Sequence, residues 1–277
     1  MVKETNRARD LLQVRGVVLD WAGTTVDFGS RAPVAAVCEV FAASGVKLTT
    51  DEARGPMGRA KRDHLQAVLC LPRIAARWRE VHGREWKEAD LDELYQKFLG
   101  IQSQCITAGS SVIDGCPEVI ATLRAQGLKI GSSTGYTREL MEGVMPRAAE
   151  EGYAPDTVVT CSDVSPGRPA PWLIYENAKR LELFPPAAIV KVDDTVAGIE
   201  AGQNAGVWCV GVVNSGNEVG LSLEEFNSLT PADRAARIAV AQQRLTAAGS
   251  HFLIDTIADL PAAIGEINAK LAAGERP

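Results

Sequence analysis

The sequence predicts an α/β protein: a doubly wound, Rossmann-like parallel sheet with a helical domain inserted into it. Two observations carry this prediction. Short apolar runs alternate with helical patterns along most of the chain, as in a parallel sheet that helices cover on both faces. In addition, the interval between the first two apolar runs holds several helical patterns, although a parallel crossover needs only one helix.

Six apolar runs are expected to be the strands of this sheet. They are short and rich in β-branched residues, and they span residues 16–20, 128–132, 157–161, 188–192, 207–212 and 251–254. One connecting helix is expected to open at Cys116-Pro117-Glu118 and to close at Gly127, because proline favours the first turn and glycine the end. Residues 215–248 are expected to form a polar, helix-rich excursion before the last strand.

The interval between Asp20 and Leu128 is expected to form a helical domain that covers the site. Its helical patterns span residues 32–44, 61–68, 73–81 and 90–106, and Gly55-Pro56-Met57-Gly58 is expected to be a loop between them. We therefore assign residues 1–28 and 107–277 to the α/β core domain and residues 29–106 to a helical cap domain. The apolar residues Val37, Val40 and Phe41 suit either the core of this cap or an interface with another chain.

Composition and charge are those of an ordinary globular protein, which can still bind a small anion where positive groups are focused in one cleft. Of the 277 residues, 46% are hydrophobic and 23% are charged. The net charge of −6 argues against nucleic acid or an acidic membrane as the main partner, because binding to phosphate backbones needs a basic face. The charged start of the chain has no apolar signal core, no run is apolar enough to span a bilayer, and the six cysteines form no CxxC pair. We expect a cytoplasmic protein.

Two of the expected strands end in segments suited to bind an oxyanion. The first runs into Leu19-Asp20-Trp21-Ala22-Gly23-Thr24-Thr25, with a carboxylate at the strand end and a small-residue turn behind it. Open α/β sheets bind ligands at this edge, and glycine lets backbone N–H groups approach an anion. The second runs into Gly131-Ser132-Ser133-Thr134-Gly135-Tyr136-Thr137, with hydroxyls and backbone amides at a helix start. Each pattern alone is also typical of a capped turn.

Charged residues follow the third and fourth strands. Gly167-Arg168-Pro169 carries an arginine suited to clamp a phosphoryl group through two N–H donors, although a lone loop arginine is usually solvated. Val190-Lys191-Val192-Asp193-Asp194-Thr195 ends in two carboxylates, which suit an oxygen-ligated cation such as Mg²⁺ or, equally, the start of a helix.

The order of these motifs, together with the helical insert, resembles the haloacid dehalogenase superfamily and its helical cap class. Most phosphatases of that superfamily carry a second aspartate two residues after the nucleophile, where this chain has Ala22. This alanine, the cap segment Gly55-Pro56-Met57-Gly58-Arg59-Ala60-Lys61-Arg62-Asp63-His64 and the segments 133–137, 167–172 and 215–217 resemble the phosphonatase (phosphonoacetaldehyde hydrolase) family. The resemblance runs from Gly16 to near the C-terminus.

This resemblance implies hydrolysis of the carbon–phosphorus bond of phosphonoacetaldehyde, in the degradation of 2-aminoethylphosphonate, by a homodimer. Lys61 would form a Schiff base with the aldehyde, and Asp20 would attack phosphorus to form an aspartyl-phosphate. A carboxylate at position 22 would hold Lys61 as an ammonium ion, which the small Ala22 avoids. The implied Mg²⁺ ligands are Asp20, the backbone carbonyl of Ala22 and Asp194, and the implied phosphoryl-binding residues are Thr134, Gly135 and Arg168.

Several other residues are weaker candidates. His64 lies three residues after Lys61, hence on the same helix face, and is a candidate proton carrier or a solvated surface histidine. Some members of the family carry an acidic residue where this chain has Gly198, so Asp193 is a candidate to supply that carboxylate. Further candidates to line the site are Ser30, Met57 and Tyr136.

The alternative function is that of a Mg²⁺-dependent phosphatase or phosphosugar mutase of the same superfamily. Ala22 argues against both, because these enzymes use the second aspartate as acid and base. A different class, a catalytically inactive binding protein on this fold, is disfavoured by the residues that the chain retains: Asp20, Thr134, Arg168, Asp194 and Lys61.

Overall fold

The computed structural model describes residues 12–277, and of residues 102–108 the backbone alone. Its core is one parallel six-stranded sheet in the order β3-β2-β1-β4-β5-β6. The strands are β1 (Gly16–Leu19), β2 (Lys129–Ser133), β3 (Thr157–Val159), β4 (Ile189–Asp193), β5 (Trp208–Val212) and β6 (Phe252–Ile254). Each lies within a residue or two of an expected strand, and the predicted α/β fold class is confirmed.

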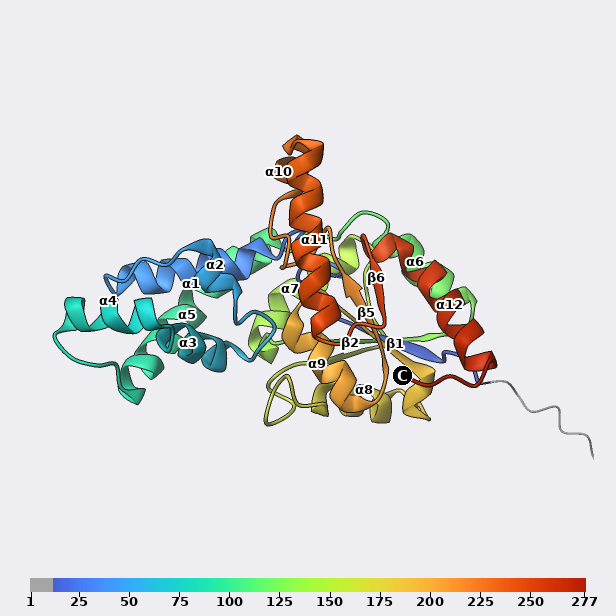
Figure 1. Cartoon of the computed structure of the whole chain (residues 1–277). Coiled ribbons are helices and arrows are strands. Elements are labelled where there is room, and N and C mark those ends of the chain that lie inside the picture. Colours follow the sequence, from blue (N-terminus) through green and yellow to red (C-terminus); the bar gives the residue numbers. More distant parts are fainter. Residues whose placement is uncertain (1–11) are drawn as a thin grey trace, which may run out of the picture.

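Helices cover both faces of the sheet, as Figure 1 shows. The helices that follow the cap are α6 (Cys116–Ala125), α7 (Arg138–Glu150), α8 (Trp172–Arg180), α9 (Val196–Ala205), α10 (Leu223–Ser228), α11 (Pro231–Ala247) and α12 (Leu260–Ala272), with 3₁₀ turns at Pro186–Ala188 and Ile257–Asp259. Val17 and Leu19 of β1 pack into a cluster with residues of α6, α7 and α12. Val18, between them, packs into the opposite cluster with residues of α8 and α9. Because successive side chains of a strand point to opposite faces, an apolar run such as β1 contributes side chains to the hydrophobic clusters on both faces of the sheet.

Five helices between β1 and α6 form the cap, on the left in Figure 1. They are α1 (Arg31–Ala43), α2 (Thr50–Arg54), α3 (Lys61–Leu69), α4 (Pro72–His82) and α5 (Glu88–Gly109). The cap has a hydrophobic cluster of its own, and Val37, Val40 and Phe41 are fully buried in it. These three residues therefore belong to the core of the cap and do not form a surface. The boundary expected at residue 106 falls inside α5, and the assignment of the two domains stays a prediction.

The sequence patterns missed α2, because five residues are too few to show a helical period. A threonine followed three residues later by a glutamate nonetheless marks its start. The Thr49 hydroxyl accepts a hydrogen bond from the Glu52 N–H, and the Glu52 carboxylate accepts one from the Thr49 N–H at 2.8 Å. This reciprocal capping satisfies two of the unpaired N–H groups of the first turn. The short helix ends at Arg54, directly before the Gly55–Gly58 loop.

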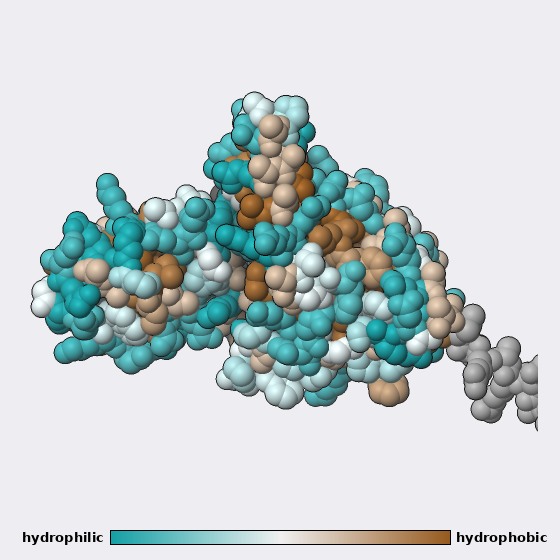
Figure 2. Space-filling model, in the orientation of Figure 1, coloured by the Kyte–Doolittle hydropathy of each residue, from teal (hydrophilic) through white to brown (hydrophobic). Residues whose placement is uncertain are grey.

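The polar excursion after β5 consists of α10 and α11, which project beyond the sheet at the top of Figure 1. Figure 2 shows apolar residues gathered at the base of this projection on an otherwise largely hydrophilic face. Ala241 and Leu245 of α11 are fully buried there. Within residues 12–277, no helix is both long and apolar enough to cross a bilayer.

Candidate active site

The carboxyl ends of β1, β2 and β4 lie side by side and bring the predicted polar residues together. Asp20 follows β1 directly, and its N–H donates to the Val192 carbonyl of β4 at 3.0 Å. Thr134 follows β2, and Asp194 follows β4. Since β1 stands between β2 and β4, Asp20 occupies the middle of the edge where open parallel sheets bind ligands.

The chain after β1 separates the core from the site. Trp21 is fully buried and packs edge-on against Tyr153, with ring centroids 4.9 Å apart. Asp20 and Ala22, on either side of it, both line one small cavity. The position two residues after the predicted nucleophile therefore faces the same space as the nucleophile, and it carries only a methyl group.

A network of buried charges holds Asp20. Arg168 Nη2 lies 2.6 Å from Asp20 Oδ1, and the same nitrogen donates to the Ser133 carbonyl at 2.8 Å. Arg168 Nη1 lies 3.3 Å from Asp193 Oδ2, and Lys191 Nζ lies 2.7 Å from that oxygen. Removing one member of such a buried network would leave its partner's charge without compensation.

Three carboxylates converge beside this network. Asp20, Asp193 and Asp194 offer oxygen atoms within 4.8 Å of one another, and all three residues are buried. Burial, reinforced by the charges of Asp20 and Asp193, raises the pKa of Asp194 well above its ordinary value. The Thr24 hydroxyl donates to Asp194 Oδ1 at 2.9 Å and the Asn217 N–H donates to Oδ2 at 2.8 Å, which fix the carboxylate. A hard divalent cation fits this oxygen-rich cluster, because it would relieve the repulsion.

Asp193 fills the space beside Gly198. A Cβ at position 198 would overlap the Asp193 carboxylate. That carboxylate accepts the Thr195 N–H at 3.0 Å and the Thr195 hydroxyl at 2.7 Å. Burial acts to raise the pKa of Asp193, but the charges of Arg168 and Lys191 outweigh it and hold the pKa below its ordinary value. The prediction that Asp193 supplies the carboxylate missing at position 198 is consistent with this contact and remains a prediction.

Lys61 is the first residue of α3, and its side chain is buried, with 3% exposed. Its Nζ lies 3.7 Å from Met57 Sδ and 5.3 Å from the centroid of the Tyr136 ring. Burial lowers the pKa of Lys61 to about 8, although Cys161 and Asp20 act in the opposite direction. An amine with this pKa is partly neutral near neutral pH, as nucleophilic attack requires.

A small cavity lies between the cap and the sheet edge. Gly58, with a φ of 87°, is so close to the Thr195 side chain that a Cβ would overlap it. A Cβ on Gly135 would lie 2.6 Å from the Arg59 carbonyl oxygen. The cavity has a volume of about 20 Å³, roughly the space of one water molecule, so a larger ligand requires the residues that line it to move. Its lining includes the predicted residues Asp20, Ala22, Ser30, Met57, Lys61, Thr134, Gly135, Tyr136 and Arg168.

His64 packs inside the cap and does not line this cavity. Its ring is fully buried, and Nε2 lies 2.8 Å from the Ala53 carbonyl oxygen, so Nε2 carries the proton. Burial, together with the Lys61 charge, lowers the pKa of His64 to about 3, which keeps the ring neutral. The solvated surface reading of His64 is wrong, and its role as a proton carrier remains a prediction.

Two charged residues with buried contacts had been given no role from the sequence. Lys191 lies in the middle of β4 and is fully buried. Its signal is a lysine inside an apolar strand, since such a charge must find a buried partner. Arg54, at the end of α2, bonds to several backbone carbonyls below the cap. No sequence pattern marks that role.

Comparison with known proteins shows which family the chain matches. The family model of haloacid dehalogenase-like hydrolases matches residues 14–206. A phosphonoacetaldehyde hydrolase from Paraburkholderia phytofirmans is 45% identical over 264 residues, which cover 95% of this chain and 99% of that protein. A phosphonoacetaldehyde hydrolase from Salmonella typhi is 46% identical over 267 residues, which cover 96% of this chain and 99% of that protein.

A solved structure is similar over nearly the same length. The crystal structure of a phosphonoacetaldehyde hydrolase-like protein from Oleispira antarctica has a TM-score of 0.93 to this chain at 43% sequence identity. The match covers 95% of this chain and 96% of that one, so it includes both the sheet and the cap helices.

Proposed function

The chain belongs to the haloacid dehalogenase-like hydrolases and, within them, to the phosphonoacetaldehyde hydrolase family, and we propose that it hydrolyses phosphonoacetaldehyde to acetaldehyde and phosphate. The observation that carries this proposal is one cavity shared by a buried lysine and a strand-end aspartate, Lys61 and Asp20. The amine would react with the aldehyde carbon of this substrate, and the carboxylate would react with its phosphorus.

Lys61 performs the first half of the proposed reaction. Its neutral amine adds to the aldehyde carbon, and loss of water gives an iminium ion. The carbon–phosphorus bond then has an electron sink: when the bond breaks, its electron pair moves toward the iminium nitrogen and an enamine forms. Protonation of the enamine carbon and hydrolysis of the imine release acetaldehyde and the free lysine. Covalent catalysis of this kind divides one difficult step into easier ones.

Asp20 performs the second half. Its carboxylate oxygen forms the bond to phosphorus as the carbon leaves, which gives an aspartyl-phosphate that water hydrolyses. Arg168 contacts the Asp20 carboxylate, and Thr134 and the Gly135 N–H lie on the adjacent strand end, where they would hold phosphoryl oxygens. Fixed donors of this kind stabilise charge without having to reorganise during the reaction.

Magnesium is the cofactor that we propose for this site. Its ligands would be Asp20, the backbone carbonyl of Ala22 and Asp194. Asp193 would lie next to these ligands, paired with Arg168 and Lys191. A bound Mg²⁺ would neutralise charge between the Asp20 carboxylate and the phosphoryl oxygens.

Ala22 separates this proposal from the phosphatase and phosphosugar mutase alternative. Hydrolysis of a phosphate ester needs an acid for the leaving oxygen, whereas here carbon leaves and the iminium ion accepts the electrons. A carboxylate at position 22 would face the cavity that also contains Lys61, and it would favour the charged ammonium form. The methyl group of Ala22 removes that influence.

We also propose a role in the degradation of 2-aminoethylphosphonate, because phosphonoacetaldehyde is that compound with its amine replaced by a carbonyl oxygen. The family resemblance further supports a cytoplasmic homodimer as part of this proposal.

The pH dependence of the reaction follows from Lys61. Below a pH of about 8 the amine is largely protonated and cannot attack, so we expect kcat/KM to rise about tenfold per pH unit and to level off above that pH. Initial rates with phosphonoacetaldehyde in buffers of constant ionic strength measure this profile. A profile that stays flat through this range would contradict the assignment of Lys61 as the amine that reacts.

Product analysis tests the proposed function itself. With Mg²⁺ and phosphonoacetaldehyde, we expect phosphate and acetaldehyde to appear in equal amounts, whereas simple phosphate monoesters should be poor substrates because Ala22 offers no acid. Phosphate is measured colorimetrically and acetaldehyde with an aldehyde reductase. Rapid hydrolysis of monoesters without cleavage of phosphonoacetaldehyde would establish the phosphatase alternative.

A further inference from the structure

We propose that Arg54 is a positioning residue that fastens the cap to the loop that supports the metal ligand Asp194. The proposal rests on the proposed function for the roles of Asp194 and Lys61. Its contacts join three segments that are far apart in the sequence: the start of the cap at residues 29–30, the end of α2, and the loop at residues 217–220.

Arg54 first binds the segment through which the chain enters the cap. Nη1 donates to the Gly29 carbonyl at 2.8 Å and lies 3.4 Å from the Ser30 carbonyl oxygen. Ser30 lines the small cavity that contains Asp20 and Lys61, and the Gly29 N–H in turn donates to the Ser215 carbonyl at 2.7 Å. The entry to the cap is thus held on both sides of Gly29, by Arg54 and by the core.

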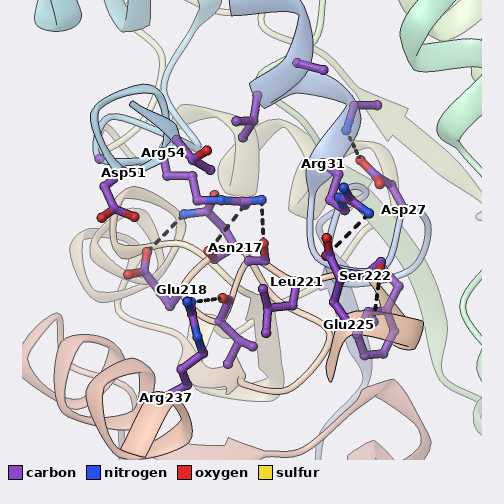
Figure 3. A pocket seen from close by; sticks show the side chains of 18 of the residues that line it. Asp27, Arg31, Asp51, Arg54, Asn217, Glu218, Leu221, Ser222, Glu225 and Arg237 are labelled. Atoms are coloured by element: carbon purple, nitrogen blue, oxygen red, sulfur yellow. Dashed lines mark hydrogen bonds and ion pairs between the residues drawn. The ribbon is translucent and has the colours of Figure 1, made fainter. Parts of the chain in front are cut away.

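The same guanidinium binds the core loop. Nη2 donates to the Gly220 carbonyl at 2.8 Å, and Nη1 lies 3.2 Å from Asn217 Oδ1 and 3.5 Å from the Asn217 carbonyl oxygen. Figure 3 shows Arg54 reaching across to Asn217 along the wall of a wide groove. This groove lies between the cap and the 217–225 segment, and its volume is about 1520 Å³. Water in the groove can compete for these bonds if the cap moves.

Asn217 connects Arg54 to the site, because it contacts both Arg54 and Asp194. Its N–H donates to Asp194 Oδ2 at 2.8 Å, while its side-chain oxygen and carbonyl face Arg54. Two residues earlier, the Ser215 hydroxyl donates to the Gly23 carbonyl at 2.9 Å, in the turn that follows Asp20. The loop that Arg54 binds therefore also binds one oxygen of the Asp194 carboxylate and the turn that follows Asp20.

Arg54 also fixes where the lysine-bearing part of the cap begins. Its carbonyl accepts the Met57 N–H at 2.9 Å, so the turn from Arg54 to Met57 is closed. Met57 contacts Lys61 Nζ, and Gly58 presses on Thr195 of the core. When Arg54 is bound to the core loop, the Met57–Lys61 segment is held over the sheet edge.

Arginine suits this place because its planar fork presents several donors in fixed directions at once. Lysine has one nitrogen on a flexible stem and cannot reach the Gly29 and Gly220 carbonyls in the same geometry. The loop is shaped to fit the fork: Gly220 has a φ of 68°, and a Cβ there would lie 2.6 Å from Arg54 Nε.

The test compares Arg54→Lys with Arg62→Lys in the full chain. Arg62 is a suitable control because it is a cap arginine that pairs with Glu88 and Asp92 of the cap itself. For Arg54→Lys we expect amide exchange at Gly29 and Asn217 to accelerate about tenfold or more, since local opening exposes those N–H groups. We also expect Mg²⁺ affinity, measured by calorimetry without substrate, to fall about tenfold, the order of effect known for residues that orient metal ligands.

For the reaction, we expect kcat with phosphonoacetaldehyde to fall about tenfold or more in Arg54→Lys, as when a lid no longer completes the site. Its Tm should fall no further than that of Arg62→Lys, which should keep wild-type values in every assay. If Arg54→Lys does not fold, Gly220→Ala replaces it and should give the same three changes.

Wild-type exchange at Gly29 and Asn217 together with wild-type Mg²⁺ affinity in the folded variant would overturn the proposal. An equal loss in Arg62→Lys would overturn it as well. Neither exchange nor calorimetry uses phosphonoacetaldehyde, so failure of the proposed function would leave these two results interpretable and would appear only in the kinetic assay.

Discussion

Asp20→Asn should abolish turnover of phosphonoacetaldehyde while the protein stays folded. The amide keeps the shape of the carboxylate but cannot form the aspartyl-phosphate, so we expect kcat to fall on the order of 10⁴-fold or more. Burial raises the pKa of Asp20 even though Arg168 opposes this. The ionised carboxylate is therefore destabilised by its burial in the folded protein. Without the Asp20 charge, Arg168 still has Asp193 as a buried partner, and the repulsion among the three carboxylates falls. Steady-state rates and thermal melts measure both effects.

Asp156→Asn is the matched control for this prediction. Asp156 pairs with Arg124 at 2.6 Å and accepts the Ile130 N–H at 2.7 Å, so it too is an aspartate that holds an arginine. It lies just before β3, at the amino ends of the strands and away from Asp20. It should keep wild-type kcat. An Asp20→Asn enzyme that retained more than a trace of activity would remove the nucleophile from the proposed mechanism.

Lys61→Arg is the second change with a large expected effect. The guanidinium keeps the positive charge but stays protonated in proteins, so it cannot form the imine. Without the iminium ion the carbon–phosphorus bond has no electron sink, and we expect kcat to fall on the order of 10⁴-fold, as for other catalytic nucleophiles. Binding of the phosphonate group should suffer less, because Arg168 and Thr134 remain. Single-turnover rates measure the effect on catalysis, and the inhibition constant of a non-reactive phosphonate measures the effect on binding.

Lys97→Arg serves as the control for Lys61→Arg. Lys97 is a cap lysine on α5 that pairs with Glu93 at 2.7 Å, and its side chain is 44% exposed. Since this amine is solvated and paired, it should contribute nothing to the reaction. Comparable losses in the two variants would mean that the effect of Lys61→Arg comes from the cap and not from the imine.

The strands and the edge of the site could be predicted because they rest on local patterns. Apolar β-branched runs gave all six strands, and the polar residues after them, Asp20, Thr134 and Asp194, had to meet once the sheet was parallel. Lys61 could not be found in this way. It reaches the cavity from the cap, and only the family resemblance connected a helix-start lysine to a strand-end aspartate.

Contacts between segments distant in the sequence escaped prediction for a physical reason. Arg54 acts on backbone carbonyls of Gly29 and Gly220, and any residue type offers such a carbonyl, so no pattern marks the partner. The burial of His64 was likewise hidden, because its helix face turns toward Ala53 of α2, a helix too short to be recognised. The overlap between a side chain at position 198 and Asp193 also becomes visible only in three dimensions.

Borohydride trapping tests the central claim, that Lys61 forms an imine with the substrate. Reduction turns the transient imine into a stable secondary amine, and peptide mass spectrometry then locates it. With phosphonoacetaldehyde or acetaldehyde present, we predict irreversible inactivation and an added ethyl group on the peptide that contains Lys61, and neither when the aldehyde is left out. Among the lysines that the structure describes, Lys61 is the one that lines the cavity containing Asp20. Modification of a different lysine, or full activity after reduction in the presence of the aldehyde, would contradict the account.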